Sequence, residues 1–209
     1  MEYEQEYGSL MESHGHSCPE LALGLRMAVA VRYHLPNASS AAVRGLAESV
    51  GCLVDGIQSA TGATVGSGRL VLENNGKLAA TFWVPQGGHG LRLQAKPGGA
   101  AFPEQAIWDD VESLRAGQDL DDSAQDRMGK VVAAILDAEP QDLLVFEEVA
   151  APQPEALRIG RFDNCMDCNE PTWYVRLFNH NGHKMCGPCH LASHGGHLPA
   201  VHPKDPVLD

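Results

Sequence analysis

The stretch that decides the N-terminal fold spans residues 14–27 and reads HGHSCPELALGLRM. Its apolar residues predict a helix that begins at Pro19, because proline is favoured where its missing N–H would lack a partner anyway. Pro36 and Asn37 end this predicted helix, and Cys18 occupies its N-cap. A helix start favours a thiolate, since unpaired backbone N–H groups and the helix dipole stabilise negative charge there.

Two imidazoles, His14 and His16, precede that cysteine, which makes the segment suitable for a metal or for a nucleophilic thiolate. A second cysteine, Cys52, stands at the start of another predicted helix, 53–60, and two such helix starts can converge. The alternative is that Cys18 and Cys52 are ordinary buried thiols beside solvated histidines. Both interpretations stay open at this point, because the H-x-H-x-C run has no fixed distance to further ligands.

The predicted helix that follows Cys52 carries Asp55 and Gln58 and leads into a glycine-rich loop, TGATVGSG. This loop has neither the lysine of a Walker loop nor the glycine spacing of a dinucleotide-binding fold. A tight connection is therefore predicted, with the hydroxyls of Thr61 and Thr64 near the pocket that the histidines and cysteines form.

The other elements are predicted from periodicity and turn residues. A short strand is expected at 42–49, and a β-hairpin around Asn74-Asn75-Gly76 is expected to pair 69–73 with 78–84. After a looser glycine-rich region, two helices and a strand are expected at 103–116, 123–138 and 143–149. The irregular alternation around an antiparallel hairpin favours an α+β fold with a mixed or antiparallel sheet.

A second, smaller domain is predicted after a proline-rich stretch at 150–155, which divides 1–150 from 151–209. Two C-x-x-C pairs separated by seventeen residues have the spacing of a four-cysteine zinc site. The four predicted ligands are Cys165, Cys168, Cys186 and Cys189. Four thiolates complete a tetrahedron, which favours structural zinc over a redox or catalytic metal that keeps a position open. So small a module needs its metal to fold.

Between the two pairs, residues 172–178 resemble a strand and Asn181-Gly182 a turn, and a short helix is expected at 190–194. The order of knuckle, hairpin, knuckle and helix predicts a treble-clef-like zinc finger. Six histidines follow residue 179, namely His180, His183, His190, His194, His197 and His202. They are interpreted as exposed side chains of a polar module, and a second, weaker metal site is the alternative.

Composition limits the classes of protein to consider. The chain of 209 residues is 44% hydrophobic and has a net charge of −12, which allows one ordinary domain and a small appendage and argues against nucleic acid as the main partner. Its longest apolar run is too short for a membrane span. The acidic N-terminus is the opposite of a targeting signal, so a cytoplasmic location is expected.

The motifs at 14–27 and 52–70, HGHSCPELALGLRM and CLVDGIQSATGATVGSGRL, together with the four-cysteine finger, resemble the FmdE family, which is named after formylmethanofuran dehydrogenase. Glu20 stands where that family commonly has glycine. The resemblance implies an α+β domain, usually dimeric, with a pocket built from the histidine and cysteine motifs, and in some members a C-terminal zinc finger. It also implies that the best pocket candidates are His16, Cys18, Cys52 and Asp55, surrounded by His14, Gln58, Thr61 and Thr64.

Three functions are compatible with these features. The first is a metal-binding accessory protein whose N-terminal pocket holds a transition metal and whose finger contacts a metalloenzyme or another protein partner. The second is an enzyme in which Cys18 or Cys52 is the nucleophile, His16 the base and Asp55 its orienting group, or in which a pocket metal activates water. The third is a partner-binding protein that uses finger aromatics, namely Trp173, Tyr174 and Phe178. The chain has no ligands for a pterin or an iron–sulfur array, so it cannot be the dehydrogenase by itself.

Overall fold

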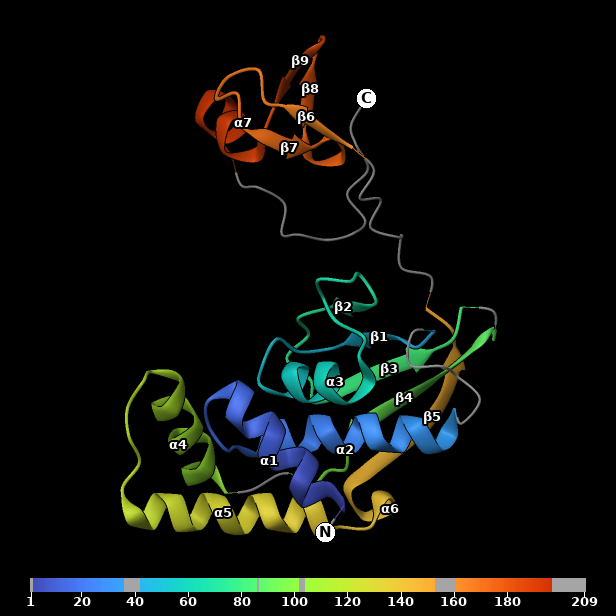
Figure 1. Cartoon of the computed structure of the whole chain (residues 1–209), viewed down its shortest axis with the longest axis vertical. Coiled ribbons are helices and arrows are strands. Elements are labelled where there is room, and N and C mark those ends of the chain that lie inside the picture. The colour runs from blue at the N-terminus through green and yellow to red at the C-terminus, as the bar shows by residue number, and fades with distance from the viewer. Residues whose placement is uncertain (1, 36–41, 86, 102–103, 153–160, 197–209) are drawn as a thin grey trace. The chain divides into compact units, whose positions relative to one another are not determined.

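A computed structural model describes residues 2–35, 42–85, 87–101, 104–152 and 161–196. The chain divides into two compact units, Met1–Pro152 and Gln153–Asp209, called here the N-terminal and C-terminal units (Figure 1). Among the described residues, no helix is both long enough and apolar enough to cross a membrane.

The N-terminal unit contains a mixed five-stranded sheet with the order β2-β1-β3-β4-β5. Its strands are β1 (Arg44–Ala47), β2 (Leu70–Leu72), β3 (Ala79–Trp83), β4 (His89–Ala95) and β5 (Leu144–Ala150). Strands β1 and β2 are parallel, and the other neighbouring pairs are antiparallel. The predicted α+β class with a mixed sheet is therefore confirmed.

Six helices accompany this sheet in the described part of the unit. They are α1 (Glu2–His14), α2 (Pro19–His34), α3 (Leu53–Thr61), α4 (Gln105–Arg115), α5 (Asp122–Asp137) and α6 (Pro140–Leu143). Helix α2 lies between α3 and α5 (Figure 1) and is buried on every side from Pro19 to Val31, as its nearly continuous apolar sequence requires. It begins at Pro19 with Cys18 at its N-cap, as predicted, whereas Pro36 and Asn37 lie outside the described residues.

Helices α2 and α3 cross at unusually close range because a glycine stands on each. A Cβ on Gly24 would lie 2.3 Å from the carbonyl oxygen of Leu53, and one on Gly56 would lie 2.5 Å from that of Leu21. Only glycine fits both positions without a backbone shift. The crossing brings the start of α2 beside the start of α3, and this is what joins two sequence motifs some thirty residues apart.

The predicted hairpin of 69–73 with 78–84 is wrong. Strands β2 and β3 form, but β1 lies between them and pairs with both. The connection between β2 and β3 crosses the end of β1. There the carbonyl of Ala47 accepts a hydrogen bond from the N–H of Glu73, and the carbonyl of Glu48 accepts from the N–H groups of Asn75 and Lys77. The asparagine-glycine signal therefore marked a true change of chain direction, but each of the two strands pairs with β1 and not with the other.

Sequence reasoning also missed strand β4 and helix α1, as well as the short helix α6. Strand β4 occupies the region interpreted as a loose glycine-rich segment, where Leu93 and Ala95 point inward with a period of two. Helix α1 is largely polar, but it buries Tyr7 and Leu10, three residues apart. The hydroxyl of Tyr7 accepts from the N–H of Cys18 at 3.1 Å, so α1 fixes the loop that precedes α2.

The C-terminal unit consists of two hairpins and a helix. Its elements are β6 (Phe162–Asn164), β7 (Pro171–Trp173), the 3₁₀ turn η1 (Tyr174–Arg176), β8 (Phe178–His180), β9 (His183–Met185) and α7 (Gly187–His194). The single strand predicted at 172–178 is thus divided, and the helix begins three residues earlier than predicted. The turn at Asn181-Gly182 is confirmed, with positive φ at both residues as a two-residue hairpin loop requires.

Candidate metal centres

Four side chains of the N-terminal unit bring their donor atoms within 4.8 Å of one another, namely His14, His16, Cys18 and Cys52. We call them the His/Cys group. They come from the end of α1, the loop after it and the N-caps of α2 and α3. The sequence run H-x-H-x-C supplied three of these positions, and the crossing of α2 with α3 supplies the fourth.

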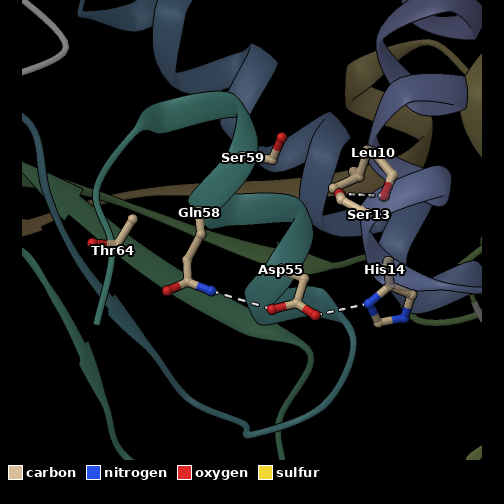
Figure 2. A pocket seen from close by; sticks show the side chains of 7 residues that line it. All are labelled: Leu10, Ser13, His14, Asp55, Gln58, Ser59 and Thr64. Atoms are coloured by element: carbon tan, nitrogen blue, oxygen red, sulfur yellow. Dashed lines mark hydrogen bonds and ion pairs between the residues drawn. The ribbon is translucent and has the colours of Figure 1, made fainter. Parts of the chain in front are cut away.

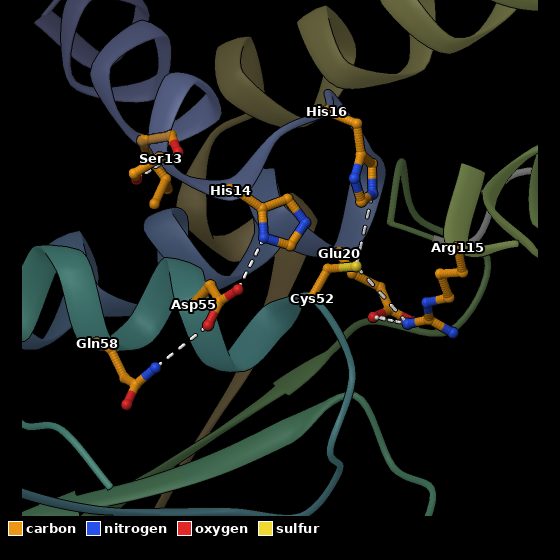
Figure 3. A network of polar contacts seen from close by, with 9 residues as sticks. Ser13, His14, His16, Glu20, Cys52, Asp55, Gln58 and Arg115 are labelled. Atoms are coloured by element: carbon orange, nitrogen blue, oxygen red, sulfur yellow. Dashed lines mark hydrogen bonds and ion pairs between the residues drawn. The ribbon is translucent and has the colours of Figure 1, made fainter. Parts of the chain in front are cut away.

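His14 is held as a metal-binding histidine would be. Its Nδ1 lies 2.7 Å from Oδ2 of Asp55, so a neutral ring carries its proton on Nδ1 and a lone pair on Nε2 (Figure 3). The side chain is only 8% exposed, and Nε2 is buried without a hydrogen-bond partner among the described residues. A carboxylate behind a ligating imidazole is the usual arrangement around a bound metal. Asp55 thus orients His14, whereas the prediction was that it would orient His16.

One pair of donor atoms in the group has about the separation of two ligands on a tetrahedral ion. Metal bonds of about 2.0 Å to nitrogen and 2.3 Å to sulfur place adjacent N and S ligands about 3.5 Å apart. Nε2 of His16 lies 3.7 Å from Sγ of Cys52, and the rings of His14 and His16 are 4.4 Å apart, centroid to centroid. Two nitrogens and two thiolates therefore form a donor set that one ion can bridge.

The two thiols of the group share one proton between unequal sites. The pKa of Cys52 lies well below its ordinary value, first because Cys18 donates a hydrogen bond to its sulfur and then because of the Arg115 guanidinium. The pKa of Cys18 is raised, since its thiol proton is held by Cys52 and its side chain is completely buried. Without metal, one thiolate at neutral pH is therefore expected, on Cys52.

Arg115 is a site residue that sequence reasoning missed. Its Nη2 lies 3.7 Å from Sγ of Cys52 and 2.9 Å from a carboxylate oxygen of Glu20, as Figure 3 shows. The residue ends α4, a predicted helix, but nothing in the sequence linked position 115 to the cysteine motifs. Glu20 thus helps to anchor Arg115 beside the thiolate, together with Glu112, whose carboxylate lies 2.9 Å from Nη1 of Arg115.

Arg115→Met is expected to raise the pKa of Cys52 in the metal-free protein, because a cation beside the thiolate is lost. Alkylation requires the thiolate and fades as pH falls through the pKa. The midpoint of alkylation rate against pH should therefore move up by about one pH unit. Lys130→Met, on the exposed side of α5, is the control and should leave the midpoint in place. An unchanged midpoint in Arg115→Met would exclude this role.

A pocket of about 340 Å³ adjoins the His/Cys group and shares His14 with it (Figure 2). Its lining residues are Leu10, Ser13, His14, Asp55, Gln58, Ser59 and Thr64. Gln58 donates from Nε2 to Asp55 at 3.2 Å and accepts at Oε1 from the N–H of Val65, so Asp55 lies between Gln58 and His14. Thr61, by contrast, does not line this pocket, because its hydroxyl donates to the carbonyl of Ile57 at 2.6 Å.

The C-terminal unit holds the second donor set, called here the four-cysteine group. Its members Cys165, Cys168, Cys186 and Cys189 also lie within 4.8 Å of one another. Two thiolates on a tetrahedral ion stand about 3.8 Å apart, and the Sγ atoms of Cys168 and Cys186 are separated by 3.8 Å. Backbone N–H groups of Cys168 and Cys186 lower the pKa of Cys165 to about 6. Such N–H donors stabilise a thiolate whether or not a metal is bound.

The finger aromatics pack largely within their own module. Trp173 lies 6.3 Å from Phe162 between ring centroids, Tyr174 packs on the small core around Leu177, and Phe178 stacks on His190. This favours a role in holding the finger together over a ready-made docking surface.

Comparison with known proteins gives three findings. A family model described as FmdE, molybdenum formylmethanofuran dehydrogenase operon, matches residues 13–145. A crystal structure of a tungsten formylmethanofuran dehydrogenase FmdE-like protein from Syntrophus aciditrophicus has a TM-score of 0.62 at 20% identity, over 92% of this chain and 94% of that one. This likeness concerns the fold alone.

A curated relative from Archaeoglobus fulgidus, named as a probable S-adenosyl-L-methionine-binding protein, is 36% identical over 88 residues. The match covers 39% of this chain and 24% of that protein, so the chain spans only a part of the relative's length.

Proposed function

This chain belongs to the FmdE family, and on that premise we propose that it is a metal-binding accessory protein. The His/Cys group binds a transition metal, and the four-cysteine group binds a structural zinc ion. The observation that supports this most directly is the buried, unpartnered Nε2 of His14 beside Asp55, among the residues that the structure describes. A buried imidazole nitrogen without a partner costs free energy in an apo protein, and a metal bond removes that cost.

The donor types indicate which metals suit the N-terminal site. Two imidazoles and two thiolates favour borderline ions such as zinc, nickel, iron or copper over magnesium or calcium. Oxyanions of molybdenum or tungsten, by contrast, are bound by hydrogen-bond donors, whereas these four side chains offer lone pairs. His16 is partly exposed, while Cys18, Cys52 and the side chain of His14 are buried. Exchange of the metal is therefore expected to begin at His16.

The test is metal analysis of the purified chain with Cys18→Ser plus Cys52→Ser. One equivalent of metal should be lost, while the metal of the four-cysteine group stays bound. His14→Gln should weaken the same site by at least about tenfold, because it removes one donor. His89→Gln removes an exposed histidine from β4 and is the matched control. Full metal content in the double cysteine variant would refute the proposal.

A second function, an enzyme with Cys52 as nucleophile, is favoured by one observation. Arg115 and His16 each lie 3.7 Å from Sγ of Cys52, next to the 340 Å³ pocket. Such surroundings activate a thiolate. The two functions differ in the metal-loaded protein, where a ligating thiolate resists alkylation. If Cys52 remains as reactive after loading with zinc or nickel as before, the enzyme is favoured and the accessory protein is not.

Three further predictions remain proposals. They are a homodimer, which the family resemblance implies, a metalloenzyme or other protein partner, and a cytoplasmic location, which was inferred from the acidic N-terminus. The homodimer is the most direct to check, by light scattering of the full chain with and without bound metal. A monomer at all concentrations would exclude it.

A further inference from the structure

Three of the histidines in the C-terminal unit converge outside the four-cysteine group. His180 ends β8, while His190 and His194 stand one turn apart on α7. Their donor atoms lie within 4.8 Å of one another. The spacing i, i+4 on a helix places two imidazoles on one face, and the hairpin adds the third. The sequence therefore contained the pair on the helix, but not its meeting with β8.

The hydrogen bonds in this cluster leave lone pairs available. Nδ1 of His194 lies 3.2 Å from the carbonyl of His190, to which only a protonated Nδ1 can donate, so a neutral ring keeps its lone pair on Nε2. Nε2 of His180 lies 3.2 Å from Nδ1 of His190. Adjacent imidazole ligands of a tetrahedral ion are about 3.3 Å apart, so this pair already has the required separation.

Stacked rings hold the cluster in place. The rings of His190 and Phe178 are 4.2 Å apart at an angle of 2°, and His180 stacks on His194 at 4.4 Å. In contrast, His183 pairs with Asp167 at 2.6 Å and takes no part, while His197 and His202 lie outside the described residues. A flat stack of this kind fixes ring orientation, which lowers the entropy lost when a ligand binds.

We propose that His180, His190 and His194 form a third metal site, which takes a divalent ion such as zinc, nickel or copper. Imidazole nitrogen suits all three ions. Three protein ligands leave at least one coordination position for water or for a donor from another molecule, unlike the complete four-cysteine group. His180 and His194 are exposed and His190 is partly exposed, so the ion can enter from solvent and leave again. The finger thus combines a structural site with an exchangeable one.

The site is tested on the full chain without a polyhistidine tag, first loaded with zinc and then titrated with nickel or copper. His180→Gln plus His194→Gln should remove one binding equivalent or weaken it at least about a hundredfold, with zinc retained in the four-cysteine group. His183→Gln is the matched control and should bind as the unaltered chain does. Copper bound at the site should show nitrogen hyperfine structure in its electron paramagnetic resonance spectrum.

Two results would overturn the inference. One is equal copper or nickel binding by the double histidine variant and the unaltered chain. The other is loss of binding in His183→Gln to the same extent, which would indicate nonspecific chelation by exposed histidines. The chain with Cys18→Ser plus Cys52→Ser separates this inference from the proposed function, because it has lost both thiolates of the His/Cys group and should still bind the ion at the finger.

Discussion

Cys186→Ser is expected to release the metal of the four-cysteine group and to unfold the C-terminal unit, while the N-terminal unit stays folded. In the described part of this unit, the buried apolar side chains besides the cysteines are those of Leu177 and Met185. So small a core cannot offset the conformational entropy of the ordered residues. In zinc modules, metal binding supplies about 10–16 kcal/mol of the folding free energy. Loss of one thiolate should remove most of it.

The measurement is amide hydrogen exchange of the full chain, which separates the two units by sequence. Amides of β6 to α7 should lose their protection in the variant, and those of α2 should keep it. Ser193→Ala, a substitution on α7 away from the cysteines, is the control and should change neither. Retained protection in the finger of Cys186→Ser would mean that packing holds this unit without its metal.

The local signals in the sequence were sufficient for features that depend on neighbouring residues. The C-x-x-C spacing predicted the four-cysteine group, and Pro19 predicted the start of α2, because both rules act within a few positions. The hairpin of 69–73 with 78–84 failed for the opposite reason. Its turn chemistry was local, but β1 entered between the strands from another part of the chain.

The His/Cys group shows the same limit. Its motifs could be found in the sequence, yet the role of Asp55 was assigned to the wrong histidine, and Arg115 was not found at all. Both contacts depend on how helices pack, which the order of residues does not reveal. The one sequence signal for that packing was a pair of glycines, Gly24 and Gly56, in the two motifs. Their role becomes evident only when each lies against the other helix's backbone.

Gly24→Ala is expected to destabilise the N-terminal unit by about 3 kcal/mol or more, which is at the upper end for overpacked cores. The new Cβ would lie 2.3 Å from the carbonyl oxygen of Leu53 and 3.1 Å from the Cα of Gly56. Both are backbone atoms, so no side-chain rotation relieves the clash and the helices must separate. Cys18 and Cys52 stand at the starts of these helices, and their separation should weaken metal binding at the His/Cys group as well.

Gly129→Ala is the matched control, since it makes the same change on α5, where a Cβ would meet nothing within 4 Å. There the higher helix propensity of alanine should add up to about 1 kcal/mol of stability. Denaturant unfolding, followed by the helical signal, gives both free energies, and metal analysis gives the content of each site. The two substitutions should thus differ in sign. If Gly24→Ala were as stable as the unaltered chain and held its pocket metal, close packing of α2 on α3 would not be what brings the two cysteines together.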